Sequence, residues 1–208
     1  MSISQIVASV LSLMIAIIGH EIMHGLVAYK YGDTTAKNAG RLSINPIVHV
    51  DLVGTIILPA LLFFSGAPFM FGWAKPVPID IRTVLRNGGY NAAIAVSLAG
   101  ITYNFFLAVV ASFIFPFFNM QGSFIGYLLY TLIIYNVILG VFNLYPIPPL
   151  DGSHAIEYLS RKLGIDAIAD FFNKIERYGM IILIIFIATP LSNIFFYPAI
   201  YIIDILLN

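Results

Sequence analysis

The chain contains no cysteine and very little charge. Of its 208 residues, 10% are charged and 60% are hydrophobic, and the mean hydropathy is +0.95. The absence of cysteine excludes a disulfide framework, a thiolate metal site and a cysteine nucleophile. A soluble globular domain carries about 25% charged residues, so this chain has too few polar groups to cover its own surface. The composition therefore predicts a protein embedded in the lipid bilayer.

The ten basic and ten acidic residues balance, so the formal net charge is zero. This balance gives no sign of a basic surface for nucleic acid, and no nucleic-acid partner is expected. No repeat, low-complexity tract or long linker divides the chain. The first apolar run lacks a preceding basic region and contains ionisable residues, so we do not expect it to be a cleaved signal. We expect a single integral-membrane domain over residues 1–208.

Five apolar stretches approach or exceed the roughly 20 residues that a helical span needs. They are residues 3–29, 52–73, 91–117, 124–144 and 180–207. Pro59, Gly66 and Pro68 interrupt the second stretch, and Pro190 and Pro198 predict kinks in the last. The predicted fold class is an all-α polytopic membrane protein with about four full spans. The stretch 52–73 is predicted to be an additional re-entrant or partial segment.

The basic residues support this topology. All ten lie in three connections, residues 30–51, 74–90 and 147–179. If 52–73 crosses completely, three basic residues lie on one side and seven on the other. If it enters and returns, all ten lie on one face, which the positive-inside rule identifies as cytoplasmic.

Two short segments have strand-like character. Residues 39–46 alternate in polarity, and the prolines within residues 75–79 confine that segment to a sheet edge. They predict a small β-hairpin or sheet on the cytoplasmic side. Residues 147–179 instead predict an amphipathic helix at the membrane interface.

A pair of histidines lies inside the first apolar run. His20 and His24 are four residues apart, so both project from one face of a helix, and Glu21 lies between them. This is the HExxH pattern, in which two histidines hold zinc and the glutamate acts as general base on the bound water. The competing interpretation is a buried polar cluster that joins helices. An ionisable residue inside a span is costly, which favours the functional interpretation.

A catalytic zinc site usually has a third protein ligand, and Asp151 is the leading candidate. It follows a proline-rich turn at the end of the fourth stretch, and Gly152 permits a close backbone approach. The alternative is that Asp151 caps the following helix. His49 is interpreted as a loop-anchoring or second-layer residue rather than a ligand, and His154 has less support still.

Three separated segments resemble the site-2 protease family of zinc intramembrane metalloproteases. They are HEIMH at residues 20–24, FGWAKPVP at 71–78 and NLYPIPPLDG at 143–152. A fourth, Leu98-Ala99-Gly100 followed by Asn104, matches the family's AGPxxN helix except that Ile101 replaces the proline. The resemblance covers residues 15 to 155. It implies a minimal member without a PDZ-like or nucleotide-binding appendage.

The resemblance implies a zinc endopeptidase that cleaves transmembrane segments of membrane proteins near the cytoplasmic side. One Zn²⁺ would be held by His20, His24 and Asp151, with Glu21 as the catalytic base. Asn104 and Asn143 are candidates for binding substrate or stabilising the oxyanion, although a buried asparagine also commonly bridges helices. Ligands on the first and fourth stretches must lie at one depth, which again favours a re-entrant 52–73.

Two other functions compete with proteolysis. A metal-ion transporter could use the same residues as a relay, although it would normally need several exchangeable sites and paired halves. A catalytically inactive scaffold that binds transmembrane helices is the other alternative. The expected partners are the bilayer and a transmembrane substrate, and a homo-oligomer is left open. The expected location is a prokaryotic cell membrane, as a multi-pass protein.

Overall fold

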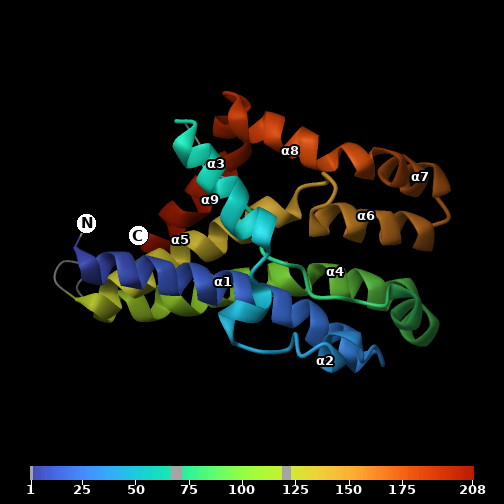
Figure 1. Cartoon of the computed structure of the whole chain (residues 1–208). Helices are drawn as coiled ribbons and strands as arrows, with labels where there is room; N and C mark the ends of the chain where they lie inside the picture. Colours follow the sequence, from blue (N-terminus) through green and yellow to red (C-terminus); the bar gives the residue numbers. More distant parts are fainter. Residues whose placement is uncertain (1, 67–71, 119–122) are drawn as a thin grey trace.

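The computed structural model describes residues 2–66, 72–118 and 123–208. Three long helices form a bundle: α1 (Ile3–Lys30), α4 (Ile81–Ile114) and α5 (Phe124–Leu144). All three are long and apolar enough to cross a membrane, α4 being extended by η3 (Phe115–Phe117). Each packs against the other two (Figure 1). The bundle therefore supplies the membrane-embedded frame of the molecule.

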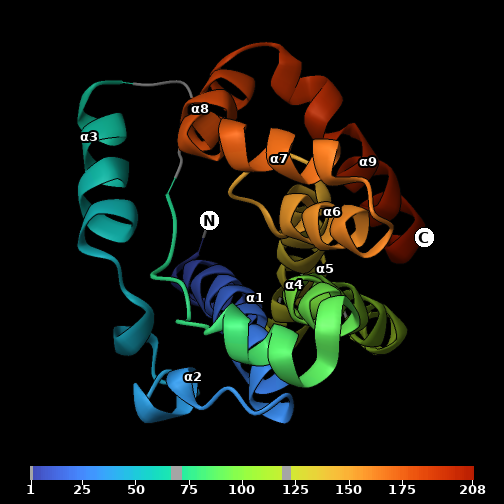
Figure 2. The ribbon, with the colours of Figure 1, turned by 90° about the vertical axis from the view of Figure 1, so that its right-hand side faces the viewer.

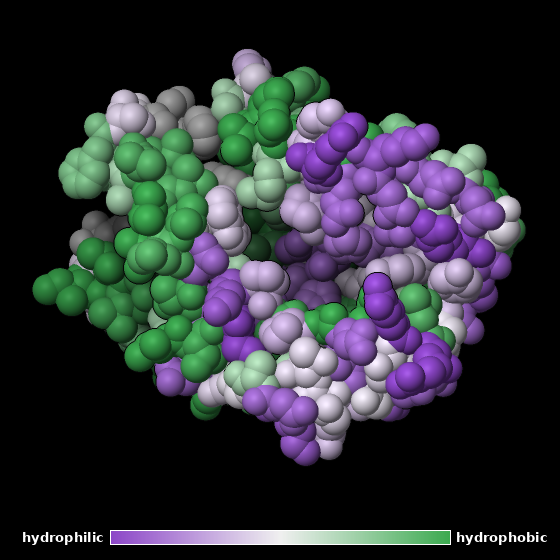
Figure 3. Space-filling model, turned by 45° about the vertical axis from the view of Figure 1, so that its right-hand side comes forward, coloured by the Kyte–Doolittle hydropathy of each residue, from purple (hydrophilic) through white to green (hydrophobic). Residues whose placement is uncertain are grey.

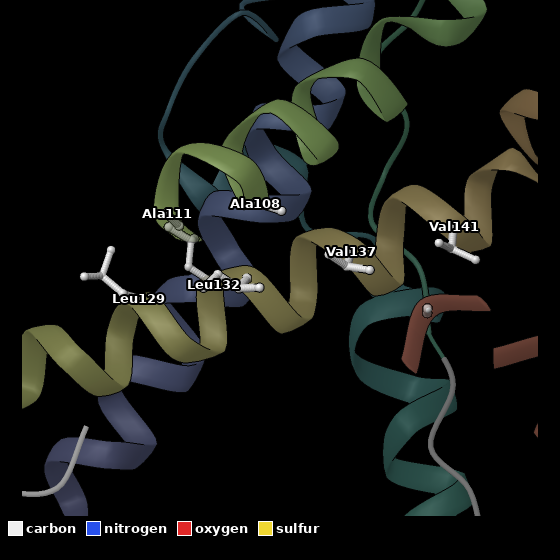
Figure 4. Packing of buried hydrophobic residues seen from close by; sticks show 8 residues of the cluster. Ala108, Ala111, Leu129, Leu132, Val137 and Val141 are labelled. Atoms are coloured by element: carbon white, nitrogen blue, oxygen red, sulfur yellow. The ribbon is translucent and has the colours of Figure 1, made fainter. Parts of the chain in front are cut away.

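Helices α1 and α4 approach closely because most of their buried residues are small, among them Ala16 and Gly25 on α1 and Ala93 and Gly100 on α4. The main buried cluster consists of Ala108, Ala111, Leu129, Leu132, Ile133, Val137, Val141 and Ala199 (Figure 4). Close packing of small side chains is the usual way in which membrane helices associate, because burial from lipid gives little hydrophobic gain. On the outer surface of the bundle, Phe106 and Phe113 of α4 are 67% and 74% exposed. Such an apolar exterior fits a surface that faces lipid.

The C-terminal part is bent rather than continuous. Helix α8 (Gly179–Ala188) is followed by α9 (Leu191–Leu207), and the segments on either side of the break differ in direction by 83°. Pro190 lies in the break, whereas α9 continues through Pro198. Residues 180–207 are thus a sharply bent pair. The described residues hold three membrane-capable helices, or four if the bent pair counts as one span.

The connection between α1 and α4 begins and ends on the same side of the bundle. The backbone N–H of Asp80 donates to Asp33 Oδ2 at 2.7 Å, and Asn87 Nδ2 donates to the Tyr31 carbonyl at 2.8 Å. The start of α4 therefore lies beside the end of α1, and the two helices run in opposite directions (Figure 1).

The apolar segment inside this connection is too short to cross a bilayer. A π-helical stretch η2 (Leu52–Ile57) continues into α3 (Leu58–Phe64), and together they extend about 20 Å against a hydrocarbon core of about 30 Å. The returning chain lies beside its own starting point, since Trp73 N–H donates to the Gly54 carbonyl at 3.1 Å. Figure 2 shows α3 standing clear of α1 and α4. These contacts agree with a segment that enters and returns on one side, which stays a prediction; residues 67–71 lie outside the described part.

The predicted β-hairpin or sheet is wrong for the residues that the structure describes. Residues 39–46 form a turn at the end of α2 (Thr35–Asn38) and lead into η1 (Pro46–His49). Residues 75–79 are extended, but they form no ladder: Arg41 donates to the Lys75 and Pro76 carbonyls, and the one backbone–backbone bond that they make within the described residues runs from the Lys75 N–H to the His49 carbonyl at 2.9 Å. Two prolines in this segment also lack the N–H that a β-ladder needs. Neither segment therefore pairs as a β-strand, although the sequence of each suits one.

Two shorter helices cover the polar end of the molecule. The predicted amphipathic segment 147–179 contains α6 (Asp151–Lys162), α7 (Asp166–Ile175) and the turn η4 (Glu176–Tyr178). Arg161 lies within 4.0 Å of carboxylates on both helices and so links them. Figure 3 shows the hydrophilic residues gathered over this end, around a hollow, with apolar surface beyond.

Candidate metal centre

His20 and His24 lie on one face of α1, and both are 7% exposed. Their Nε2 atoms are 3.0 Å apart. Asp151 Oδ2 lies 3.0 Å from Nε2 of His20 and 3.1 Å from Nε2 of His24. Residues that are more than 120 positions apart in the sequence therefore converge on one point. Among the described residues this is the one group of three that could hold a metal ion.

The position of Asp151 follows from the end of α5. Helix α5 ends at Leu144, a proline-rich turn follows, and Asp151 opens α6. A Cβ on Gly152 would lie 2.2 Å from the Leu144 carbonyl oxygen, so the start of α6 can reach the end of α5 because residue 152 is glycine. The residue that precedes the helix is Leu150, not Asp151. The carboxylate of Asp151 points to the histidines and does not cap α6.

Hydrogen bonds on the far side of each ring decide how the imidazoles are presented. His24 Nδ1 lies 2.7 Å from the Val96 carbonyl oxygen, and a carbonyl only accepts, so Nδ1 is the donor. In the neutral ring this leaves a lone pair on Nε2. His20 Nδ1 lies 2.6 Å from Oδ1 of Asn104 and presents Nε2 in the same way.

The three converging atoms fit a zinc ion. Ligand bonds of about 2.0–2.1 Å at tetrahedral angles separate neighbouring donor atoms by about 3.3 Å, close to the separations of 3.0–3.1 Å given above. Two nitrogen lone pairs and one carboxylate oxygen at this spacing repel one another unless they share a cation. Two histidines and a carboxylate are also a familiar catalytic zinc set.

Gly100 on α4 gives the imidazoles their space. A Cβ at this position would lie 2.5 Å from His20 Cε1 and 2.5 Å from His24 Nε2. Any side chain there would displace both rings. The sequence interpretation quoted Gly100 only as part of a resemblance and assigned it no role. The sequence offered one indication of this role: Gly100 lies four residues before Asn104 and therefore on the same helix face.

Glu21 is half-buried, and its carboxylate contacts the returning segment. Its Oε2 accepts from the backbone N–H of Val77 at 2.8 Å. Val77 itself packs against α1 at Gly25, where a Cβ would lie 3.0 Å from Val77 Cγ1. The segment with the sequence WAKPVP therefore contacts the candidate base directly. The sequence did not predict this contact.

The two candidate asparagines lie in different surroundings. Asn104 is fully buried, and its Nδ2 donates to the Ala16 carbonyl and to Asn136 Oδ1 at 3.1 and 2.8 Å. With Oδ1 facing His20, both amide atoms have partners, an arrangement that favours the helix-bridging interpretation. Asn143 is half-buried and donates to the Leu139 carbonyl one turn earlier, at 3.0 Å.

The other two histidines lie outside the cluster. His49 donates from Nε2 to the Ser43 carbonyl at 2.8 Å, which agrees with its interpretation as a loop anchor. His154 lines a small pocket between α6 and α7 with Glu157 and Asn173.

Comparison with known proteins agrees with the sequence resemblance. The profile described as Peptidase family M50 matches residues 119–187, which include Asp151. The chain is 35% identical over 197 residues to the Bacillus subtilis protein named "Putative zinc metalloprotease YwhC", covering 91% of this chain and 84% of that one. It is 27% identical over 190 residues to "Putative zinc metalloprotease Rip2" of Mycolicibacterium smegmatis, covering 88% and 67%.

No solved structure matches this chain significantly. The sequence comparisons nevertheless cover most of its length and include both the α1 and α6 regions of the cluster. The protein belongs to the site-2 protease family, peptidase family M50, a family of membrane-embedded zinc metalloproteases.

Proposed function

We propose that this metalloprotease is an intramembrane endopeptidase, which cleaves transmembrane segments of other membrane proteins near the cytoplasmic side. The observation that carries the proposal is the convergence of His20, His24 and Asp151 at one depth, at the ends of two membrane helices. We propose that these three residues hold a single Zn²⁺. The chain would act as one domain over residues 1–208, in a prokaryotic cell membrane, with the bilayer and a transmembrane substrate as its partners.

The depth of the cluster supports the cytoplasmic side. His24 lies under two turns from the end of α1, and Asp151 opens α6 just after α5 ends. The connections beyond both helix ends carry basic residues, as cytoplasmic loops do. Water needed for hydrolysis would then reach the cluster from the polar end of the molecule, which Figure 3 shows as hydrophilic.

The residues around the cluster support hydrolysis. When bound, zinc supplies a Lewis acid that polarises water and the scissile carbonyl. Glu21 then takes the proton from the attacking water and delivers it to the leaving amine. The Val77 N–H occupies one oxygen of the Glu21 carboxylate and leaves the other for these transfers. Asn143, at the end of α5, remains the candidate for contact with the substrate backbone.

The re-entrant segment supports a membrane-borne substrate. Helix α3 has no buried residue, and its Phe63 and Phe64 are 69% and 84% exposed. In lipid, such a face can contact acyl chains or an apolar helix of another protein. A soluble peptide would gain no comparable contact there.

A Glu21→Gln substitution tests the proposal. In cells that express this variant, full-length membrane proteins cut by the wild-type enzyme should accumulate, and their fragments should disappear in quantitative proteomics. The purified variant should keep its zinc, because Glu21 is not a ligand. Glu157→Gln, which changes a glutamate outside the cluster, is the matched control and should cleave normally.

Two results would contradict the proposal. One is unchanged cleavage of membrane proteins by Glu21→Gln. The other is zinc flux through the wild-type protein in proteoliposomes without any loss of cleavage products in the variant, which would favour a transporter.

A further inference from the structure

Asn136 is a fully buried amide near the middle of the apolar helix α5, and none of the quoted motifs includes it. Its Oδ1 accepts from Asn104 Nδ2 at 2.8 Å, and its Nδ2 donates to the Leu132 carbonyl at 2.8 Å. Asn104 in turn meets His20 at 2.6 Å. A continuous chain of hydrogen bonds therefore joins the centre of α5 to a candidate metal ligand on α1.

The direction of this chain is set by backbone carbonyls, which can only accept. The Leu132 carbonyl requires the NH₂ group of Asn136, so the oxygen of that amide faces Asn104. The Ala16 carbonyl requires the NH₂ group of Asn104, and the oxygen of Asn136 requires the same group. Both contacts turn Oδ1 of Asn104 toward His20. His20 must then carry its proton on Nδ1, and the lone pair remains on Nε2.

The two histidines differ in what holds the proton on Nδ1. His24 donates directly to the Val96 carbonyl, an acceptor that cannot turn. His20 faces a side-chain amide, whose oxygen and nitrogen could exchange places by rotation. Only the partners of the Asn104 Nδ2 group prevent that rotation. Of its two hydrogen bonds, to the Ala16 carbonyl and to Asn136, the one to Asn136 is the shorter.

We infer that Asn136 is a positioning residue for the metal centre: through Asn104 it holds His20 in the tautomer and orientation that binds zinc. The inference rests on the proposed assignment of His20 as a zinc ligand. Outer partners of ligating histidines typically change metal affinity by about 10- to 100-fold when they are removed. Asn136 lies one residue further out, so we expect the lower end of that range.

Asn136→Leu and Asn136→Asp test the inference in the purified full chain by zinc titration against a competing chelator. Leucine has the same shape but no polar atoms, and should raise the zinc Kd by roughly tenfold. A buried aspartic acid stays neutral, donates to Leu132 and accepts from Asn104, so it should bind zinc nearly as the wild type does. Cobalt substituted for zinc should show altered visible absorption bands in the leucine variant only.

Thr131→Val is the matched control. Thr131 also lies in α5 and is buried, and its hydroxyl lies 2.8 Å from the hydroxyl of Ser12, which bridges to α1 away from the cluster. The valine variant should lose a bond between helices without changing the zinc Kd. If Asn136→Leu does not fold, Asn136→Ala supplies the same measurement with a smaller side chain.

The outcomes are distinct. Wild-type zinc affinity and cobalt spectrum in the leucine or alanine variant would overturn the inference, as would an equal loss of affinity in Thr131→Val. Failure of the wild-type chain to bind zinc, or unchanged binding after His20→Ala, would instead refute the proposed metal centre.

Discussion

Gly100 and His24 lie so close that a Cβ added to the glycine would be 2.5 Å from the imidazole Nε2. The backbone of α4 therefore forms one wall of the candidate metal centre. His20 is equally close to this wall. A shift of either ring away from α4 would therefore separate its Nε2 from the other imidazole and from Asp151. The packing of α4 on α1 thus defines the spacing of the ligand atoms.

Gly100→Ala should weaken zinc binding by more than about tenfold, because the added methyl group must push at least one ring out of position. Zinc content of the purified variant measures the effect. Gly140→Ala is the control, since its new Cβ would meet only the Phe105 ring, at 3.1 Å, which can turn aside. Full zinc occupancy in Gly100→Ala would contradict the geometry described above.

Arg41→Met should slow proteolysis and leave zinc in place. Arg41 is 6% exposed, and its Nη2 donates to the Lys75 carbonyl at 2.6 Å. This contact holds the segment that presents the Val77 N–H to Glu21. Because a displacement of about 1 Å in a catalytic group can cost 10²-fold in rate, we expect a 10- to 100-fold lower turnover. Arg82→Met, at an exposed position near the start of α4, should leave turnover unchanged. Equal turnover in both variants would exclude this role for Arg41.

Single introduced cysteines can test the membrane topology. The chain has no cysteine of its own, so only the introduced residue reacts with a thiol reagent. Asn38→Cys and Arg82→Cys lie before and after the re-entrant segment and should react with an impermeant maleimide from the same side of the membrane. Ser4→Cys, at the opposite end of α1, should react from the other side. Labelling of residues 38 and 82 from opposite sides would mean that 52–73 crosses the bilayer.

Zinc should stabilise the folded protein through its three ligands. A ligand that binds only the folded state at 100 times its Kd adds about 2.7 kcal/mol, so chelation should lower the unfolding temperature of the wild-type chain. His24→Ala should show no such shift, whereas His154→Ala, outside the cluster, should respond as the wild type does. A shift that persists in His24→Ala would place the stabilising metal elsewhere.

The pairing of the two histidines in the candidate centre was predictable from local spacing, whereas the approach of Asp151 to them was predicted mainly through the family resemblance. His20 and His24 share a helix face by spacing alone, and an ionisable group within an apolar run is costly enough to attract attention. The return of the connection between α1 and α4 to the side from which it left was also predictable, since a full crossing would have separated the basic residues and placed Asp151 away from the histidines.

The errors came from patterns that different structures satisfy equally well. Alternation in residues 39–46 suits a strand, but here the chain turns, and backbone groups at the start of this segment bond to the backbone of α2. Of the two prolines predicted to kink the last apolar run, Pro190 lies at the break but α9 continues through Pro198, and the size of the bend depends on what the two helices pack against. Neither the 83° angle nor the loop conformation is encoded in a local pattern.

The sequence by itself determined that the chain is apolar enough for a membrane and that two histidines share one helix face, because composition and spacing act locally. The choice of Asp151 as their partner came mainly from the family resemblance. Only the tertiary structure decided that Gly100 makes room for the ligands, that Val77 meets Glu21, and that Asn136 lies behind His20. Those relationships depend on how α1, α4, α5 and the segment before α4 pack together, and a contact between distant segments produces no periodic pattern within either one.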